Sequence, residues 1–171
     1  SEGTVRALLG KELMTENGLL TEQGSSTFWD RSTLYALRGI YIAGQADRAT
    51  EFLSHYARRR LLGDHVPYPI EAWPEGSQRH LAAESGLFCR VITEGLFGIR
   101  PTGFRSFDLT PSMPSGWNRM ALRHIRAFEN NFDLVIEKQP DGFLRVTLAI
   151  SGRNPRAFRL RQGASLRIKL P

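Results

Sequence analysis

The segment from Pro67 to His80 carries side chains of the kinds that bind and activate polar organic molecules. It holds two carboxylates, two aromatic rings, an arginine and a histidine: Glu71, Glu75, Tyr68, Trp73, Arg79 and His80. Carboxylates bind hydroxyl groups, and a carboxylate beside a bound water can act as a general base. Aromatic rings stack on the apolar faces of pyranose rings. This set is typical of a sugar site in which Glu71 or Glu75 activates water.

A second candidate group opens the helix expected from residue 28 to 43. It consists of Trp29, Asp30 and Arg31. If this helix and the one that follows the 67–80 segment start side by side, both groups would open on one cleft. Glu84 lies one turn into that later, otherwise apolar helix, where an unpaired buried carboxylate is costly. Glu84 should therefore face either the cleft or an arginine such as Arg31.

Each of these residues also has a purely structural interpretation. Glu71 and Glu75 could be solvated loop acids, and Trp73 could plug the space under the loop. Asp30 and His80 could be helix-start residues that capping and the helix dipole stabilise. Composition and spacing leave both interpretations open. No nucleophilic Cys-His or Ser-His-Asp motif is present, and the four histidines lack metal-ligand spacing, so neither a metal nor another cofactor is expected.

Apolar residues spaced by three and four predict helices over residues 4–14, 28–43, 46–62 and 80–97. Gly44 should stop the second helix and create a tight helical hairpin, and Ser25, Ser26 or Thr27 should cap it. Tyr35, Tyr41 and Phe52 are expected in the core. The fourth helix is apolar on most sides, so it should expose apolar surface unless a partner covers it. Its cysteine, Cys89, is expected to be a buried structural thiol.

Beyond Pro101 the period of the apolar residues changes to two. Alternation on both sides of Asp141-Gly142 predicts a β-hairpin, and further strands are expected over 106–110, 119–128 and 165–170. Helices come first and strands follow. The expected fold class is therefore α+β, with helices over residues 1–100 and an antiparallel β-rich domain over 101–171.

The net charge of +6 comes from the second of these regions. Residues 1–100 contain 11 Lys and Arg against 12 Asp and Glu, whereas residues 101–171 contain 12 against 5. The basic residues mostly alternate with apolar ones, which indicates a solvated strand face or docking onto an acidic partner domain. No aromatic-interleaved basic cluster accompanies them, so nucleic acid is not an expected partner. No apolar run approaches about 18 residues and no signal-peptide layout opens the chain, so we expect a soluble protein without a membrane partner; the compartment stays open.

Several segments, taken in order, resemble one enzyme family. They are Asn17-Gly-Leu-Leu-Thr-Glu22, Phe28-Trp-Asp-Arg31, Glu94-Gly-Leu-Phe-Gly-Ile-Arg-Pro101 and Leu109-Thr-Pro-Ser-Met-Pro-Ser-Gly-Trp117. This order resembles the C-terminal end of six-hairpin glycosidases, the α-glucosidase, trehalase, glycogen-debranching and sugar-phosphorylase relatives built on an (α/α)6 barrel. The most specific match is Gly-Ile-Arg-Pro followed by Leu-x-Pro-x-x-Pro-x-x-Trp. In the family this is the exit from the last barrel helix into a terminal β domain.

The resemblance implies roles for the candidate residues. In the family, a glutamate in the loop before the last inner helix is often the catalytic base; Glu71 is the nearest match and Glu75 the second. Trp29, Asp30 and Arg31 resemble the family's Trp-Arg-Gly-Pro-like segment, although the Gly-Pro is absent here. The general acid of such enzymes comes from an earlier helix, so it is expected outside this chain.

The length of the chain also indicates that the barrel is incomplete. Twelve barrel helices of about 12 residues with loops of about 5 need on the order of 200 residues, whereas this chain offers three or four helices. The barrel should be completed by an upstream region, another chain or self-association. The expected function is the C-terminal part of a glycoside hydrolase of the inverting type. Two alternatives stay open: a phosphorylase in which Ser77, Arg79 and His80 hold phosphate, and a non-catalytic carbohydrate-binding or structural fragment.

Overall fold

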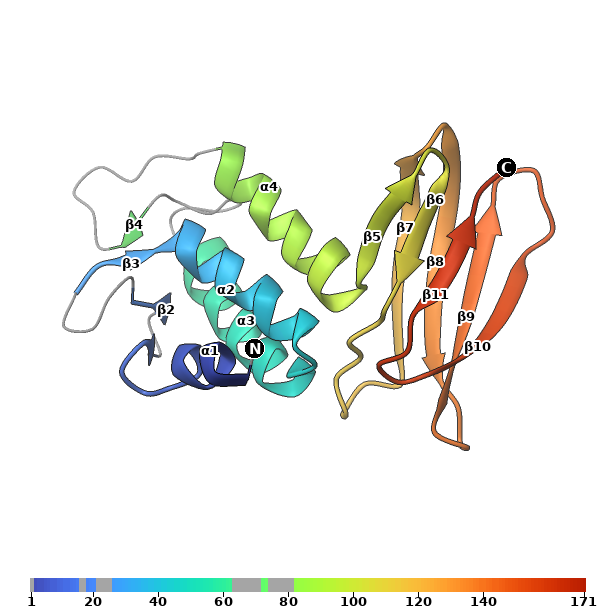
Figure 1. The fold of residues 1–171 in the computed structure, drawn as a ribbon. Helices are drawn as coiled ribbons and strands as arrows, with labels where there is room; N and C mark the ends of the chain where they lie inside the picture. The colour runs from blue at the N-terminus through green and yellow to red at the C-terminus, as the bar shows by residue number, and fades with distance from the viewer. Residues whose placement is uncertain (1, 16–17, 21–25, 63–71, 74–81) are drawn as a thin grey trace. The chain divides into compact units, whose positions relative to one another are not determined.

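The computed structural model describes residues 2–15, 18–20, 26–62, 72–73 and 82–171, without the side chains of residues 60, 72 and 73. The chain forms two compact units, Ser1–Leu96 and Phe97–Pro171 (Figure 1). The first is helical and the second is built from antiparallel strands. The fold class is therefore α+β, as the switch in apolar period indicated.

The helical unit contains the four helices that apolar spacing predicted. They are α1 (Glu2–Leu8), α2 (Asp30–Ile42), α3 (Ala46–Leu61) and α4 (Ala82–Arg90), the last of which continues as the π-helix η1 (Val91–Leu96). Gly44, with φ of 80°, makes the short α2–α3 turn. The buried apolar residues recur at three and four positions along α2, α3 and α4–η1, whereas α1 has no buried residue. They include Leu34, Leu37, Ile40 and Tyr41 of α2, Ala49, Phe52, Leu53 and Tyr56 of α3, and Leu87 and Val91. No helix in the described part of the chain is long and apolar enough to cross a bilayer.

The start of α2 differs from the prediction. Its N-cap is Trp29, which makes no side-chain cap hydrogen bond, so the cap expected at Ser25, Ser26 or Thr27 is wrong. The chain is still extended at this point, because Phe28–Trp29 (β3) pairs antiparallel with Ala72–Trp73 (β4). A second short pair, Met14–Thr15 (β1) with Gly18–Leu19 (β2), lies next to it through a bridge from Leu20 to Phe28.

Two side chains expected in the interior are on the surface. Tyr35 is 48% exposed, and the guanidinium of Arg38 lies over its ring at 5.4 Å from the centroid. Cys89 is exposed rather than buried. The exposed residues of α4 besides Cys89 are Arg90 and three small ones, Ala82, Ala83 and Gly86, whereas Leu87 is buried. A residue type that is usually buried does not decide the face on which it stands.

The β unit consists of two antiparallel sheets. One has the order β10-β9-β8-β7 and the other β11-β6-β5. The predicted hairpin is β8 (Asn130–Lys138) with β9 (Phe143–Ile150), and the other predicted strands are β6 (Ser106–Leu109), β7 (Arg119–Ala127) and β11 (Leu166–Lys169). β5 (Ile99–Gly103) and β10 (Arg156–Arg161) were not predicted. β5 contains Pro101 and Gly103, which are depleted in strands, and three of the six residues of β10 are arginines.

The two sheets pack face to face. Phe107 of β6 stacks on Phe132 of β8 and on Phe128, with ring centroids 6.0 and 6.1 Å apart. Alternate residues of the strands fill the space between the sheets, among them Leu109, Ile168, Leu134, Ile136, Leu144, Val146 and Leu148. The unit is therefore a small sandwich.

Gly98, in the Gly-Ile-Arg-Pro segment, is required at the entrance to this sandwich. Its φ is +65°, and a Cβ at this position would lie 2.0 Å from the carbonyl oxygen of Thr110. The amide of Thr110 donates a hydrogen bond to the Gly98 carbonyl at 3.0 Å. Only glycine fits both the backbone angle and the close approach.

Candidate functional site

The first part of the candidate site is the start of α2. The β3 strand ends at Trp29, a residue that is 37% exposed, and α2 begins at Asp30, which is 1% exposed. Thr33 fixes this start, because its hydroxyl donates to the carbonyl of Trp29 at 3.0 Å and accepts from the amide of Leu19 at 3.3 Å. A carboxylate in the first turn is stabilised by the helix dipole, which accounts in part for the burial of Asp30.

The second part is the ion pair between Arg31 and Glu84, in the first turns of α2 and α4. Nε and Nη2 of Arg31 both lie 2.7 Å from Oε1 of Glu84. The Glu84 side chain is fully buried, whereas that of Arg31 is 52% exposed. Oε2 of Glu84 is buried and has no hydrogen-bond partner among the described residues. The arginine expected opposite Glu84 is thus present, and one carboxylate oxygen remains unsatisfied.

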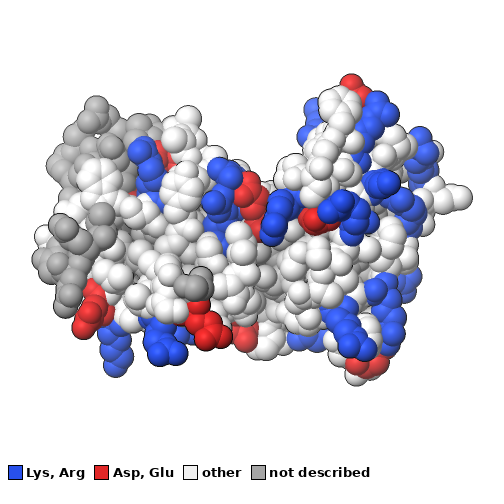
Figure 2. Space-filling model, viewed as in Figure 1, with Lys and Arg blue, Asp and Glu red and all other residues white. Residues whose placement is uncertain are grey.

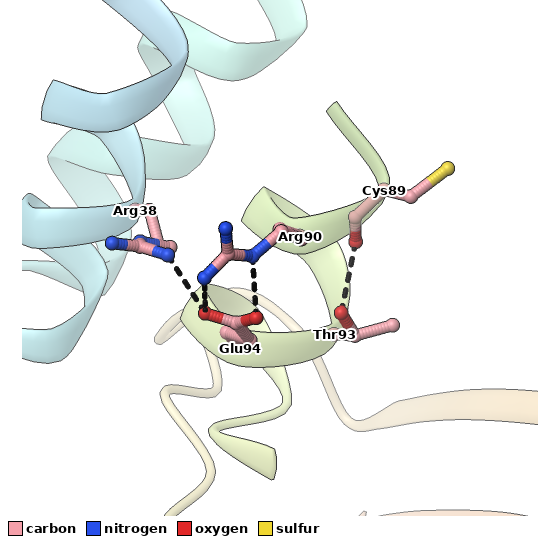
Figure 3. A network of polar contacts seen from close by, with 5 residues as sticks. All are labelled: Arg38, Cys89, Arg90, Thr93 and Glu94. Carbon is pink, nitrogen blue, oxygen red and sulfur yellow. Dashed lines mark hydrogen bonds and ion pairs between the residues drawn. The ribbon is translucent and has the colours of Figure 1, made fainter. Parts of the chain in front are cut away.

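A second ion-pair cluster joins the same elements farther along (Figure 3). Nη1 of Arg38 lies 2.8 Å from Oε2 of Glu94, and Arg90 donates to both oxygens of Glu94 at 2.6 and 3.1 Å. The hydrogen bond from Arg90 lowers the pKa of Glu94 against the opposing effect of burial, and the charge of Arg38 adds to the lowering. The Thr93 hydroxyl donates to the carbonyl of Cys89 at 3.1 Å inside the same helix.

The two clusters define the direction of the helices. Arg31 pairs with Glu84 and Arg38, two turns later, pairs with Glu94. The pairs occur in the same order along both segments, so α2 and α4–η1 run parallel and both helices start at the same end. The starts of α2 and α4 therefore lie side by side, which is the condition under which the two candidate groups would open on one cleft.

The β3–β4 pair brings a third segment to this end. Ala72 lies opposite Trp29, and Trp73 lies opposite Phe28. The remaining predicted site residues of the 67–80 segment, Glu71, Glu75, Tyr68, Arg79 and His80, lie outside the described residues, and only the backbone of Trp73 is described. The structure therefore joins Trp29, Asp30, Arg31 and Glu84 and leaves the two catalytic candidates untested.

No family model, curated protein or solved structure matches the chain. The function has to be argued from these residues.

The described part of the site suits neutral hydroxyl groups. Asp30 and Glu84 contribute two carboxylates against one guanidinium, that of Arg31. A hydroxyl group can donate to a carboxylate oxygen and accept from a guanidinium, so both kinds of group can bind one. Among the described residues, no three His, Cys, Asp or Glu side chains gather as a metal site requires.

Sequence reasoning missed the Arg38–Glu94–Arg90 cluster. One signal was available: Arg90 and Glu94 stand four apart, the spacing at which opposite charges meet on a helix. Arg38 stands seven residues after Arg31, on the same side of α2, which could have indicated a second acidic partner on the facing helix. The π-helical widening at Val91–Leu96 has no comparable sequence signal.

Proposed function

We propose that this chain is the C-terminal part of a glycoside hydrolase in which α2 and α4 are neighbouring inner helices of an (α/α)6 barrel. The observation that carries the proposal is the buried carboxylate of Glu84 at an end where two parallel helices start together. One of its oxygens has no hydrogen-bond partner in the part of the chain that the structure describes. Buried polar groups are nearly always hydrogen-bonded, so an unsatisfied one in a native fold points to a functional role.

Substrate binding at this end would use the described residues directly. The Arg31 side chain is half exposed, and its outer nitrogens can donate to a sugar hydroxyl oxygen. The partly exposed indole of Trp29 offers a surface for a pyranose ring. The resemblance to six-hairpin glycosidases adds to this interpretation, since the family builds its site from the same kind of segments.

The chemistry would be carried by a glutamate of the 67–80 segment. Glu71 directly precedes the β4 residue Ala72, which pairs with Trp29, and Glu75 follows two positions after Trp73. In the proposed inverting reaction, the ionised glutamate removes a proton from water as the water attacks the anomeric carbon. A carboxylic acid from the rest of the barrel protonates the leaving oxygen. The two carboxyl groups of such a pair stand roughly 6.5–9.5 Å apart.

The charge of the site favours water over phosphate as the attacking group. Phosphorolysis needs a pocket that attracts an anion, and the cation described at the starts of α2 and α4, Arg31, is already paired with Glu84. Hydrolysis does not require such a pocket. A non-catalytic role remains the competing proposal, because a sugar-binding surface needs the same hydroxyl partners without a base.

The test is turnover by the full-length protein that contains this chain, on a panel of α- and β-linked oligosaccharides. Glu71→Gln and Glu75→Gln are compared with Glu51→Gln, a matched loss of one carboxylate on the exposed face of α3. We expect one of the first two variants to lose about 10²–10⁴-fold in kcat, and the control to keep its rate. Full activity in both loop variants would contradict the assignment of the base.

Two further outcomes separate the alternatives. Strict dependence of turnover on added phosphate would replace hydrolysis by phosphorolysis. Saturable sugar binding without turnover on any member of the panel would favour the non-catalytic role.

A further inference from the structure

The β unit contains a pocket that the proposed function does not use. Its volume is about 230 Å³, and it lies where the turn between β9 and β10 meets the end of β11. The polar part of its lining is Arg153, Asn154, Arg156 and Lys169. Ile150 and Leu170, both buried, belong to its apolar part.

Positive charge in this pocket is not balanced by side chains of the unit. Residues 97–171 are all described and contain five carboxylates, and each of these is in an ion pair elsewhere. The pairs are Asp108–Arg167, Glu129–Arg105, Asp133–Arg123, Glu137–Arg119 and Asp141–Arg159. Blue side chains accordingly dominate the region of the strands in Figure 2. Even when a terminal carboxylate at Pro171 is counted, the lining keeps a surplus of positive charge.

One of the two arginines is already held in place. Nη2 of Arg156 donates to the carbonyl oxygen of Lys169 at 2.9 Å, and its guanidinium lies 5.7 Å from the ring centroid of Phe158. This hydrogen bond links β10 and β11, which are edge strands of the two sheets. A guanidinium that is ordered in advance loses less conformational freedom when it binds a ligand.

The second arginine stands on the turn itself. The amide of Arg153 donates to the carbonyl of Ile150 at 3.0 Å, and Gly152, with φ of 74°, allows the tight turn. The turn places a guanidinium and the side-chain amide of Asn154 on the pocket lining beside Arg156. These groups supply several N–H donors and two positive charges.

We propose that this pocket binds an oxyanion group, a sulfate, phosphate or carboxylate. Guanidinium groups bind such groups through paired N–H donors, and an anion removes the repulsion among the cations of the lining. The inference does not depend on the enzymatic proposal, because no residue of α2 or α4 takes part. The oxyanion group could be a free inorganic anion or part of an acidic sugar. In the second case the sugar ring would contact the pocket as well.

The test is an NMR titration of the chain with sodium sulfate at constant ionic strength, with sodium chloride as the reference. We expect saturable shifts confined to the backbone amides of residues 150–154, 156, 169 and 170. Arg153→Gln should weaken sulfate binding at least tenfold, and Arg156→Lys, which keeps the charge and loses the planar fork, should weaken it as well. Arg145→Gln removes the same charge from an exposed position of β9 outside the pocket and should leave binding unchanged.

Equal weakening in Arg145→Gln, or shifts that do not saturate, would overturn the proposal, since either result describes general attraction of anions to a basic surface. Glucose 6-sulfate and glucuronate then identify the source. Binding at least tenfold tighter than that of sulfate supports an acidic sugar, and equal affinity supports a site for the anionic group alone. Thermal unfolding of each variant checks that the fold is intact.

Discussion

Arg31 directs two of its nitrogens to a single oxygen of Glu84, Oε1, and the buried Oε2 has no partner within residues 2–15, 18–20, 26–62, 72–73 and 82–171. A fully satisfied pair would use both oxygens of the carboxylate. Because Oε2 of Glu84 has no hydrogen-bond partner among the described residues, the ion pair contributes little to stability and is a good candidate for a functional role.

Single substitutions at this pair should destabilise the chain, and the double substitution should not. Arg31→Met leaves the buried Glu84 carboxylate without its cation, at an expected cost of about 2 kcal/mol. This lies below the usual range for buried pairs, because the Arg31 side chain is half exposed. The double variant Arg31→Met/Glu84→Met removes both charges and should recover most of that loss. Urea unfolding of the three proteins measures the effect, and a double variant less stable than Arg31→Met would show that the pair is structural.

Gly95 should not tolerate a side chain, although it lies in a helix. A Cβ there would stand 3.2 Å from Cδ2 and 3.3 Å from Cβ of Tyr41, and 3.4 Å from Cα of Arg38. Tyr41 is fully buried and cannot move freely, so Gly95→Ala should cost roughly 1–2 kcal/mol.

Gly86 is the matched control on the same helical segment. A Cβ at Gly86 meets nothing within 4 Å, so Gly86→Ala should stabilise by roughly 0.5–1 kcal/mol through helix propensity. Thermal unfolding midpoints that move in opposite directions would confirm the close approach of η1 to α2. Shifts of the same sign and size would contradict it.

The Glu94 cluster should make stability depend on pH in the acidic range. The pKa of Glu94 is lowered from its ordinary value of 4.5, chiefly by the hydrogen bond from Arg90. A carboxylate with a lowered pKa stabilises the fold above its unfolded-state pKa, and this contribution is lost as the pH falls through the folded-state value. Glu94→Gln should therefore unfold at a lower temperature than the parent at pH 7, and the difference should shrink as the pH falls below 4.5.

The control for this prediction is Glu51→Gln, which removes one carboxylate from the exposed face of α3. Its difference from the parent should change less with pH than that of Glu94→Gln. If the Glu94→Gln difference were constant from pH 7 to pH 3, its cause would be packing rather than the ion pairs.

Much of the fold could be predicted from the period of the apolar residues. Leu34, Leu37 and Tyr41 recur at three and four positions and are all buried, and the alternation around Asp141-Gly142 became the β8–β9 hairpin. Prediction failed where a local pattern competes with tertiary packing. The expected cap of α2 is absent because the chain before α2 is extended as β3, which pairs with Ala72 and Trp73.

The candidate site could be predicted from the sequence only in part. The Arg31–Glu84 pair followed from one physical rule, that a buried carboxylate needs a partner. Cys89 was misplaced because thiols are usually buried and the helix around it is largely apolar. Its real environment depends on which face of α4 packs on α2, and Leu87 and Val91, rather than Cys89, are the buried residues.

The exposed thiol of Cys89 provides a test of the barrel proposal. In the free chain a maleimide should label Cys89 as fast as it labels a small thiol, because the side chain is exposed. Neighbouring Ala82 and Gly86 are small and exposed on the same face, which allows another helix to approach closely. In a longer polypeptide that supplies further barrel helices, this face of α4 should be covered and labelling should slow at least tenfold. Cys89→Ser controls for labelling of other cysteines in the added region, and an unchanged rate at Cys89 would argue against a barrel helix packed beside α4.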